Sequence, residues 1–127
     1  PLPIALDEEL IGILDVTKKN EMLQTIQPQY IILKPSLVGG FAASEEWICL
    51  AEKNDVGLWI TSALESNVGL NAIAQWTATL KNQMPQGLGT GALFTNNIES
   101  PLEVVKGGLL YNPSKEWNIN LMNSLCL

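Results

Sequence analysis

The stretch Tyr30-Ile31-Ile32-Leu33-Lys34-Pro35-Ser36 decides the fold prediction for this chain. Its first four residues form a continuous apolar run of strand formers, which is typical of a strand buried on both faces. Lys34 follows at the point where this strand stops. Two other apolar runs end in the same way: Ile4–Leu6 runs into Asp7-Glu8, and Leu58–Thr61 runs into a polar loop. Ionisable groups at strand ends are typical of α/β enzymes, which place their chemistry there.

Helical patterns alternate with these strands. Asp15 can cap a predicted helix over residues 16–26, whose apolar side is expected to hold Val16, Met22, Leu23 and Ile26. A second helix is predicted over residues 42–53, with Glu45 and Glu46 in its first turn, and a third over residues 67–81, with Val68, Ala72 and Trp76 at helical spacing.

The remaining sequence is expected to hold a short fourth strand near residues 86–89 and a hairpin around Gly107-Gly108. For residues 117–127 we expect a short helix or strand. The whole pattern predicts an α/β fold with a parallel sheet and right-handed crossovers. A complete (β/α)8 barrel takes ~250 residues. The 127 residues are therefore expected to form a partial (β/α)8 TIM-like barrel of about four βα units plus a C-terminal hairpin and tail.

Composition excludes several classes of function. The 127 residues include 13 acidic and 7 basic side chains, so the net charge is −6, and 46% of residues are hydrophobic. Nucleic-acid binding requires clustered Lys and Arg, so neither nucleic acid nor an anionic membrane surface is an expected partner. No apolar run approaches the roughly 20 residues needed to span a bilayer, and no signal-peptide pattern opens the chain. We therefore expect a cytoplasmic protein.

The side chains available for chemistry are restricted. The chain has no histidine, so acid–base steps must use Lys, Asp, Glu or Tyr, and a metal must be a hard cation bound by oxygen, such as Mg²⁺. Cys49 and Cys126 lie far apart in sequence, and we favour two reduced thiols over a disulfide.

Three segments together resemble one family. They are Ile4-Ala5-Leu6-Asp7-Glu8, Ile31 to Gly40 with its Lys34-Pro35, and Ile60 to Leu70 with its Ser62-Ala63-Leu64-Glu65-Ser66 loop. They are similar to the C-terminal half of the barrel domain in the o-succinylbenzoate synthase family of the enolase superfamily. The resemblance covers essentially the whole chain. It implies that residues 1–127 are the C-terminal part of a barrel domain whose capping domain and first strands are absent.

The resemblance also implies a site. In this superfamily, three carboxylates at successive strand ends hold one Mg²⁺, and two lysines face each other across the substrate. Asp7 matches one metal ligand and Lys34 matches one catalytic lysine, which stabilises an enediolate by its charge. The other ligands and the second lysine have no counterpart, because the sequence starts after them. The implied reaction is the Mg²⁺-dependent syn-dehydration of a cyclohexadiene carboxylate to 2-succinylbenzoate in menaquinone biosynthesis.

Each site residue also has a simpler explanation. Asp7 alone could be a helix cap or a solvated loop carboxylate, and Lys34 alone could be a surface lysine. Function is favoured because both follow the end of a strand, one βα unit apart. Glu8 either orients a ligand or pairs with a lysine as a group behind the metal ligands. Gly87–Gly91 lacks the Lys-Ser/Thr ending of a phosphate loop and is interpreted as a tight turn.

The loop after the third strand precedes a predicted helix N-terminus, where free amides favour an anion. We expect it to hold a substrate carboxylate, or else to serve only as a helix cap through Ser66 or Asn67. Glu65 is expected to be a structural partner of the loop amides. The candidate substrate-binding residues are Ser62, Ala63, Leu64 and Ser66.

Three functions remain open on this basis. The first is a synthase fragment that is inactive alone and acts, when complete, on a small carboxylate substrate. The second is another lyase, racemase or cycloisomerase of the same superfamily, and the third is a non-catalytic α/β binding or assembly module. Because half a barrel leaves open sheet edges, the isolated chain is also expected to self-associate.

Overall fold

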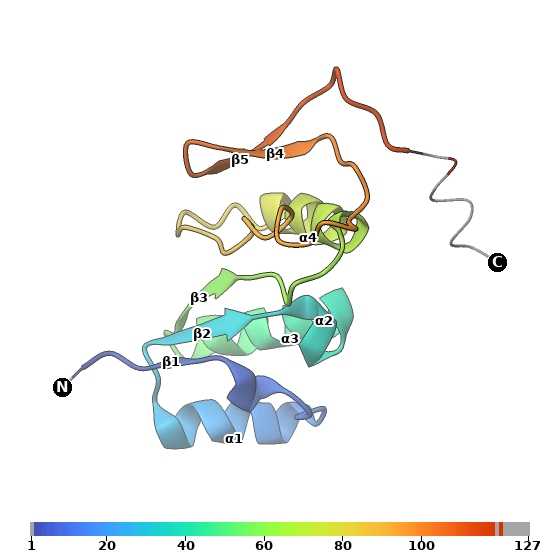
Figure 1. The fold of residues 1–127 in the computed structure, drawn as a ribbon. Coiled ribbons are helices and arrows are strands. Elements are labelled where there is room, and N and C mark those ends of the chain that lie inside the picture. Colours follow the sequence, from blue (N-terminus) through green and yellow to red (C-terminus); the bar gives the residue numbers. More distant parts are fainter. Residues whose placement is uncertain (1, 119, 121–127) are drawn as a thin grey trace.

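A computed structural model of the protein describes residues 2–118 and residue 120. Its centre is a parallel sheet of three strands in the order β1 (Ala5–Leu6), β2 (Tyr30–Leu33) and β3 (Gly57–Ile60). The other elements are η1 (Glu8–Leu10), α1 (Val16–Ile26), α2 (Pro35–Val38), α3 (Gly40–Lys53), α4 (Asn67–Thr79), and the antiparallel hairpin of β4 (Leu102–Val105) and β5 (Gly108–Tyr111). The predicted partial α/β barrel with a hairpin is confirmed (Figure 1).

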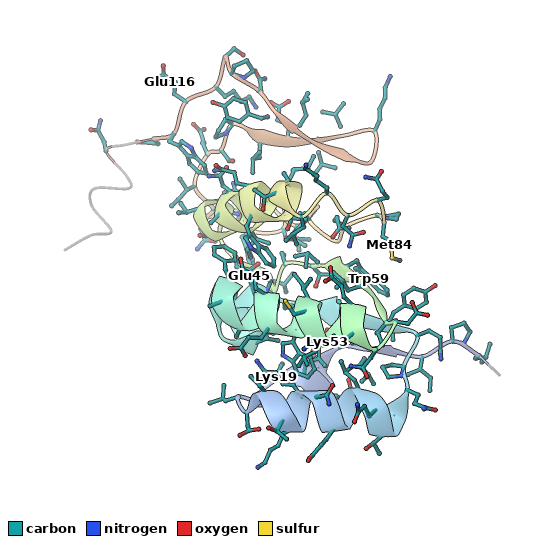
Figure 2. The ribbon with its side chains drawn as sticks, turned by 180° about the vertical axis from the view of Figure 1, so that it is seen from behind. Lys19, Glu45, Lys53, Trp59, Met84 and Glu116 are labelled. Atoms are coloured by element: carbon teal, nitrogen blue, oxygen red, sulfur yellow. The ribbon has the colours of Figure 1, made fainter. Side chains whose placement is uncertain are left out.

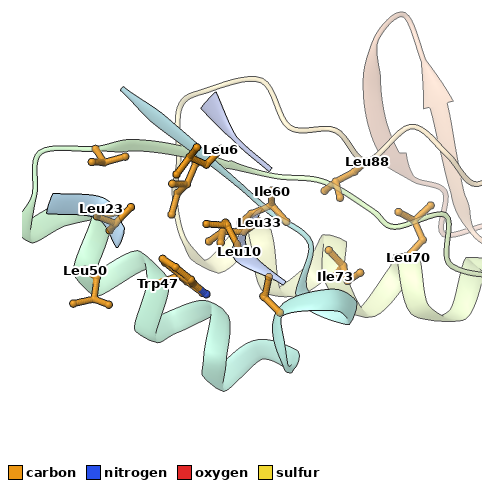
Figure 3. Close-up of a cluster of buried hydrophobic side chains, with 14 residues drawn as sticks. Leu6, Leu10, Leu23, Leu33, Trp47, Leu50, Ile60, Leu70, Ile73 and Leu88 are labelled. Carbon is orange, nitrogen blue, oxygen red and sulfur yellow. The ribbon is translucent and has the colours of Figure 1, made fainter. Parts of the chain in front are cut away.

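One face of the sheet carries most of the core. In the register, Leu6 pairs with Ile31 and Leu33 pairs with Ile60, and all four side chains are buried. They pack against the helices, whose contributions include the fully buried Trp47 (Figure 3). Burial of each large apolar side chain contributes roughly 1.5–3 kcal/mol. The opposite face holds alternate residues such as Ile32 and Trp59, which stay partly exposed.

Helix α1 differs from its prediction on the side that it buries. Asp15 caps it as expected, accepting a hydrogen bond from the Lys18 amide at 3.0 Å. The core face, however, holds Leu23 and the buried Lys19. Seen from behind, Lys19 points from α1 toward α3 (Figure 2), where its Nζ lies 2.7 Å from Glu46 and 5.4 Å from the Trp47 ring. The ion pair with Glu46 and the contact with the Trp47 ring together offset the cost of burying the Lys19 charge.

The predicted fourth strand is reduced to a single bridge between Thr61 and Gly87. Two backbone hydrogen bonds support it, from the Gly87 amide to the Ile60 carbonyl and from the Ser62 amide to the Gly87 carbonyl. The Ile60 amide donates instead to the side chain of Gln86 at 2.7 Å. Because a side chain replaces a backbone carbonyl there, the ladder does not extend into a full strand.

Two helix boundaries also differ. Helix α3 begins at Gly40, two residues before the predicted start, so Glu45 and Glu46 do not lie in its first turn. Gly39 and Gly40 make this early start possible because both have positive φ angles, 103° and 85°, which glycine adopts without strain. Helix α4 ends at Thr79 rather than residue 81. It buries Leu70, Ile73 and Thr77, whereas Val68 and Ala72 are exposed.

The C-terminal region is confirmed as a hairpin, with Lys106 and Gly107 at positive φ between its two strands. The predicted tail element over residues 117–127 lies largely outside the described residues. Cys49 is a free, exposed thiol, and Cys126 also lies outside the described residues. Within the described part of the chain, none of the helices has the length and apolar character required to cross a bilayer.

Candidate active site at the carboxyl edge of the sheet

Asp7 and Lys34 meet at the carboxyl edge of the sheet. Asp7 follows the last residue of β1, and Lys34 follows the last residue of β2. Because side chains alternate along a strand, both residues belong to the partly exposed face rather than the core face. The Lys34 Nζ donates to the Asp7 Oδ1 at 2.5 Å, and the two side chains are 17% and 38% exposed. The structure thus brings the two principal sequence candidates into direct contact.

Glu9, which the sequence did not single out, also contacts this pair. Its carboxylate accepts a hydrogen bond from the Asp7 amide at 3.1 Å. Hydrogen bonds from its own amide and from the Asp7 amide hold the pKa of Glu9 below its usual range. The predicted Glu8 lies exposed at the start of η1. The sequence signal for Glu9 was limited to its place two residues after Asp7, a spacing that suits a turn.

The loop after β3 is built around Glu65. One oxygen of its carboxylate accepts from the Ala63 amide at 2.8 Å, and the other accepts from the Ser36 hydroxyl. Burial raises the pKa of Glu65, but the hydrogen bonds from Ser36, Ala63, its own amide and Ser62 together lower it below the usual range. Glu65 is therefore a charged carboxylate at neutral pH and an internal partner of the loop, as the sequence suggested.

Ser62 and the amides of the loop are engaged internally. The buried Ser62 hydroxyl lies 2.5 Å from the Thr90 hydroxyl and accepts from the Leu64 amide at 3.2 Å. Since the amides of Ala63 and Leu64 both donate within the loop, the predicted anion site at these amides is not open in this structure. The parts of the loop that face outward are the side chains of Leu64, which is 54% exposed, and Ser66.

The N-terminus of α4 is also occupied. Ser66 is the N-cap residue but makes no side-chain cap hydrogen bond, which corrects the expectation of a cap from Ser66 or Asn67. Instead, the Asn67 amide donates to the side chain of Asn97 at 2.8 Å, and Asn97 donates to the Gly91 carbonyl at 3.0 Å. The end of the Gly-rich stretch lies close to this helix end, since an added Cβ on Gly91 would lie 2.5 Å from the Asn67 side-chain oxygen. The turn itself comes later than predicted, with the Leu93 amide donating to the Thr90 carbonyl, because Gly87 is held in the bridge to Thr61.

The donor set for a metal is incomplete in this chain. Across residues 2–118 and 120, no group of three or more His, Cys, Asp or Glu side chains comes together in a way that suits a metal ion. Mg²⁺ prefers near-octahedral oxygen coordination. Within the described residues, Asp7 and its neighbours therefore do not form a complete Mg²⁺ site.

A separate apolar groove of about 750 Å³ lies between α4 and the hairpin, with Leu88, Leu109 and Trp117 in its lining. None of the predicted site residues lines it. Exposed apolar side chains instead occur in the segments that follow the strands, including α2 and the start of α3. They are Leu14, Leu37, Phe41, Leu64, Leu93 and Phe94.

Comparison with known proteins agrees with this geometry. No family model matches the chain. The o-succinylbenzoate synthase of Desulfotalea psychrophila strain LSv54 is 64% identical over 110 residues, which cover 87% of this chain and 29% of that protein. The crystal structure of MenC from the same strain superposes with a TM-score of 0.82 at 62% identity, covering 86% of this chain and 30% of that one. A muconate cycloisomerase variant gives a TM-score of 0.73 at 21% identity, covering 98% of this chain and 35% of that one, and so shares the fold.

The fold defines this chain as part of an enolase-superfamily barrel. Within that superfamily, its sequence places it with the o-succinylbenzoate synthases. The chain spans less than a third of the length of the Desulfotalea relative. It therefore accounts for one part of such a protein.

The first prediction concerns the long-range cap on α4. Asn97→Ala removes the acceptor of the Asn67 amide and should lower the free energy of unfolding by about 1–2 kcal/mol. Urea denaturation measures this loss, and amide exchange should speed up at Asn67. Asn96→Ala is the matched control, because Asn96 is exposed next to Asn97 in the same loop. Equal stabilities of the two variants would contradict the cap.

Proposed function

We propose that residues 1–127 are the C-terminal part of the barrel domain of an o-succinylbenzoate synthase, with its capping domain and first strands outside this chain. The observation that carries the proposal is the contact between Asp7 and Lys34 at adjacent strand ends in a chain 64% identical to such a synthase. The exposed apolar side chains in the segments that follow the strands support it, because exposed apolar surface favours cover by another part of the protein.

The proposed reaction is the dehydration of a cyclohexadiene carboxylate to 2-succinylbenzoate in menaquinone biosynthesis. It removes a proton next to the substrate carboxylate and then expels water. Negative charge develops on the carboxylate oxygens as the proton leaves. Lys34, held on the open face of the sheet, stabilises that charge with its ammonium group. A second group that moves the proton belongs to the part of the barrel outside this chain.

Mg²⁺ is the proposed cofactor of the complete enzyme, with Asp7 as one of its oxygen ligands. Glu8 is proposed to orient a ligand behind Asp7, and Glu9 fixes the Asp7 backbone. Toward the substrate we propose the loop after β3: Leu64 and Ser66 face outward, while Ser62, Ala63 and Glu65 form its frame. The acidic composition supports a cytoplasmic enzyme that acts on a small carboxylate rather than on nucleic acid or membranes.

A second candidate is another lyase, racemase or cycloisomerase on the same fold. Solved structures such as the muconate cycloisomerase variant share the architecture at 21% identity, which supports the fold alone. The sequence identity of 64% to a synthase favours the first candidate over this one. A non-catalytic α/β module is the third, and the Asp7–Lys34 contact on the open face argues against it.

The second prediction tests Lys34 in the full-length protein. Lys34→Ala should lower turnover of the cyclohexadiene carboxylate by a factor on the order of 10³ or more, because it removes charge stabilisation specific to the transition state. The fold should persist, since Lys34 lies off the core face. Lys53→Ala, at the exposed end of α3, is the charge-matched control and should keep full turnover. Retention of more than about a tenth of turnover by Lys34→Ala would contradict its role.

The third prediction concerns the metal. Isothermal titration of the 127-residue chain with Mg²⁺ should show only weak binding, because no group of three or more candidate ligands comes together among the described residues. In the full-length protein, Asp7→Asn should weaken Mg²⁺ binding, whereas Asp55→Asn, an exposed residue before β3, should not. Tight one-to-one binding by the isolated chain would refute this assignment.

The fourth prediction concerns assembly of the isolated chain, which we propose to self-associate through its open edges. Strand β1 pairs only with β2 among the described strands, and its outer edge is free to pair with a second copy. Light scattering should give a dimer or larger species. Ala5→Lys should shift it toward 13.9 kDa, because a charge on the edge opposes strand pairing, while Gln24→Lys on the exposed side of α1 should not. A wild-type monomer at micromolar concentration with cooperative unfolding would be the contrary result.

A further inference from the structure

A set of side-chain hydrogen bonds joins the segments that follow β2, β3 and the Thr61–Gly87 bridge. The Ser36 hydroxyl, in the short helix α2 after β2, donates to Glu65 in the loop after β3. The Ser62 hydroxyl of the same loop lies 2.5 Å from the Thr90 hydroxyl of the Gly-rich stretch. These contacts join residues 29 and 28 positions apart in the sequence. They therefore fix neighbouring βα units to one another at the edge where Asp7 and Lys34 lie.

Ser36 is rigidly connected to Lys34. The two residues are separated only by the buried Pro35, which opens α2 with Lys34 as its N-cap. The amides of Leu37 and Val38 both donate to the Lys34 carbonyl, at 2.8 Å and 3.2 Å. A group bonded to Ser36 is thereby attached to the turn that carries the catalytic lysine. Glu65 is that group.

The position of Glu65 is built into the surrounding backbone. A Cβ on Gly69 would lie 3.0 Å from the Glu65 Cβ, so glycine at this place leaves the room that the side chain needs. The Ala63 amide donates to the second carboxylate oxygen at 2.8 Å. Between Ala63 and Glu65, Leu64 adopts a φ of 64°. This conformation costs a non-glycine residue energy and persists only where its surroundings hold it.

We infer that Glu65 is a positioning residue: its carboxylate joins the Lys34 turn, through Ser36, to the loop that presents Leu64 and Ser66, and so sets the placement of that loop relative to Lys34. Ser62 and Thr90 extend the connection to the Gly-rich stretch. This inference rests on the proposed function for its catalytic consequence, whereas the connection between the loops is a property of the structure itself. The charge on Glu65 matters because a carboxylate accepts both hydrogen bonds more strongly than a neutral amide.

The test uses the full-length protein with Glu65→Gln, Ser36→Ala and the double variant. Glu52→Gln, an exposed residue of α3, is the charge-matched control. Both single variants should raise KM for the cyclohexadiene carboxylate by about tenfold, with kcat changed by less than about threefold, because substrate placement is loosened while Lys34 remains. The double variant should be no worse than Glu65→Gln alone, since both remove the same contact. Hydrogen exchange of residues 61–66 should speed up in both.

Two kinetic results would overturn the inference. A fall in kcat with KM unchanged would make Glu65 a participant in the chemical step, and unchanged constants in both single variants would show that the contact positions nothing. If Glu65→Gln does not fold, Ser36→Ala alone decides. If the wild-type protein shows no synthase turnover, the proposed function fails, but exchange still decides the structural link: faster exchange of residues 61–66 supports it, and unchanged exchange rejects it.

Discussion

The in-register parallel pairing of β1, β2 and β3 is the constraint on which the rest of this structure depends. Because Leu6 pairs with Ile31 and Leu33 with Ile60 on the face that packs against the helices, the alternate positions must face the other way. Asp7 and Lys34 occupy such positions one step beyond their strands. Parallel strands also end at the same edge, so one pattern of burial delivers both side chains to one place.

The loops at that edge are held by contacts between distant residues rather than by their own sequence. Asn97 caps a helix that begins 30 residues earlier, and Glu65 receives a hydrogen bond from Ser36, 29 residues earlier. Each bond spans about one βα unit. The site is therefore a property of the assembled units, and local disruption of one loop would be transmitted to the next through these few polar side chains.

The second face of the sheet is left partly exposed in this chain. One sheet face is packed by helices, whereas the face of Ile32 and Trp59 stays partly exposed, and the segments that follow the strands carry exposed apolar side chains. This distribution agrees with a chain that covers less than a third of its Desulfotalea relative. Closure of the barrel by further strands would bury that surface, because a closed barrel leaves no open sheet edge.

The strands, the order of the βα units and the Asp7–Lys34 pair were determined by the sequence by itself, because apolar runs and strand-end charges are local patterns. Tertiary structure alone decided three features. Lys19 is buried because it forms an ion pair with Glu46 and contacts the ring of Trp47, both on α3. The fourth strand shrinks to a bridge because the Gln86 side chain takes the Ile60 amide. The loop amides are closed to an anion because Glu65 and Ser62 already accept from them. In each case the deciding partner is distant in sequence or is a side chain in competition with the backbone, and local periodicity carries no information about either.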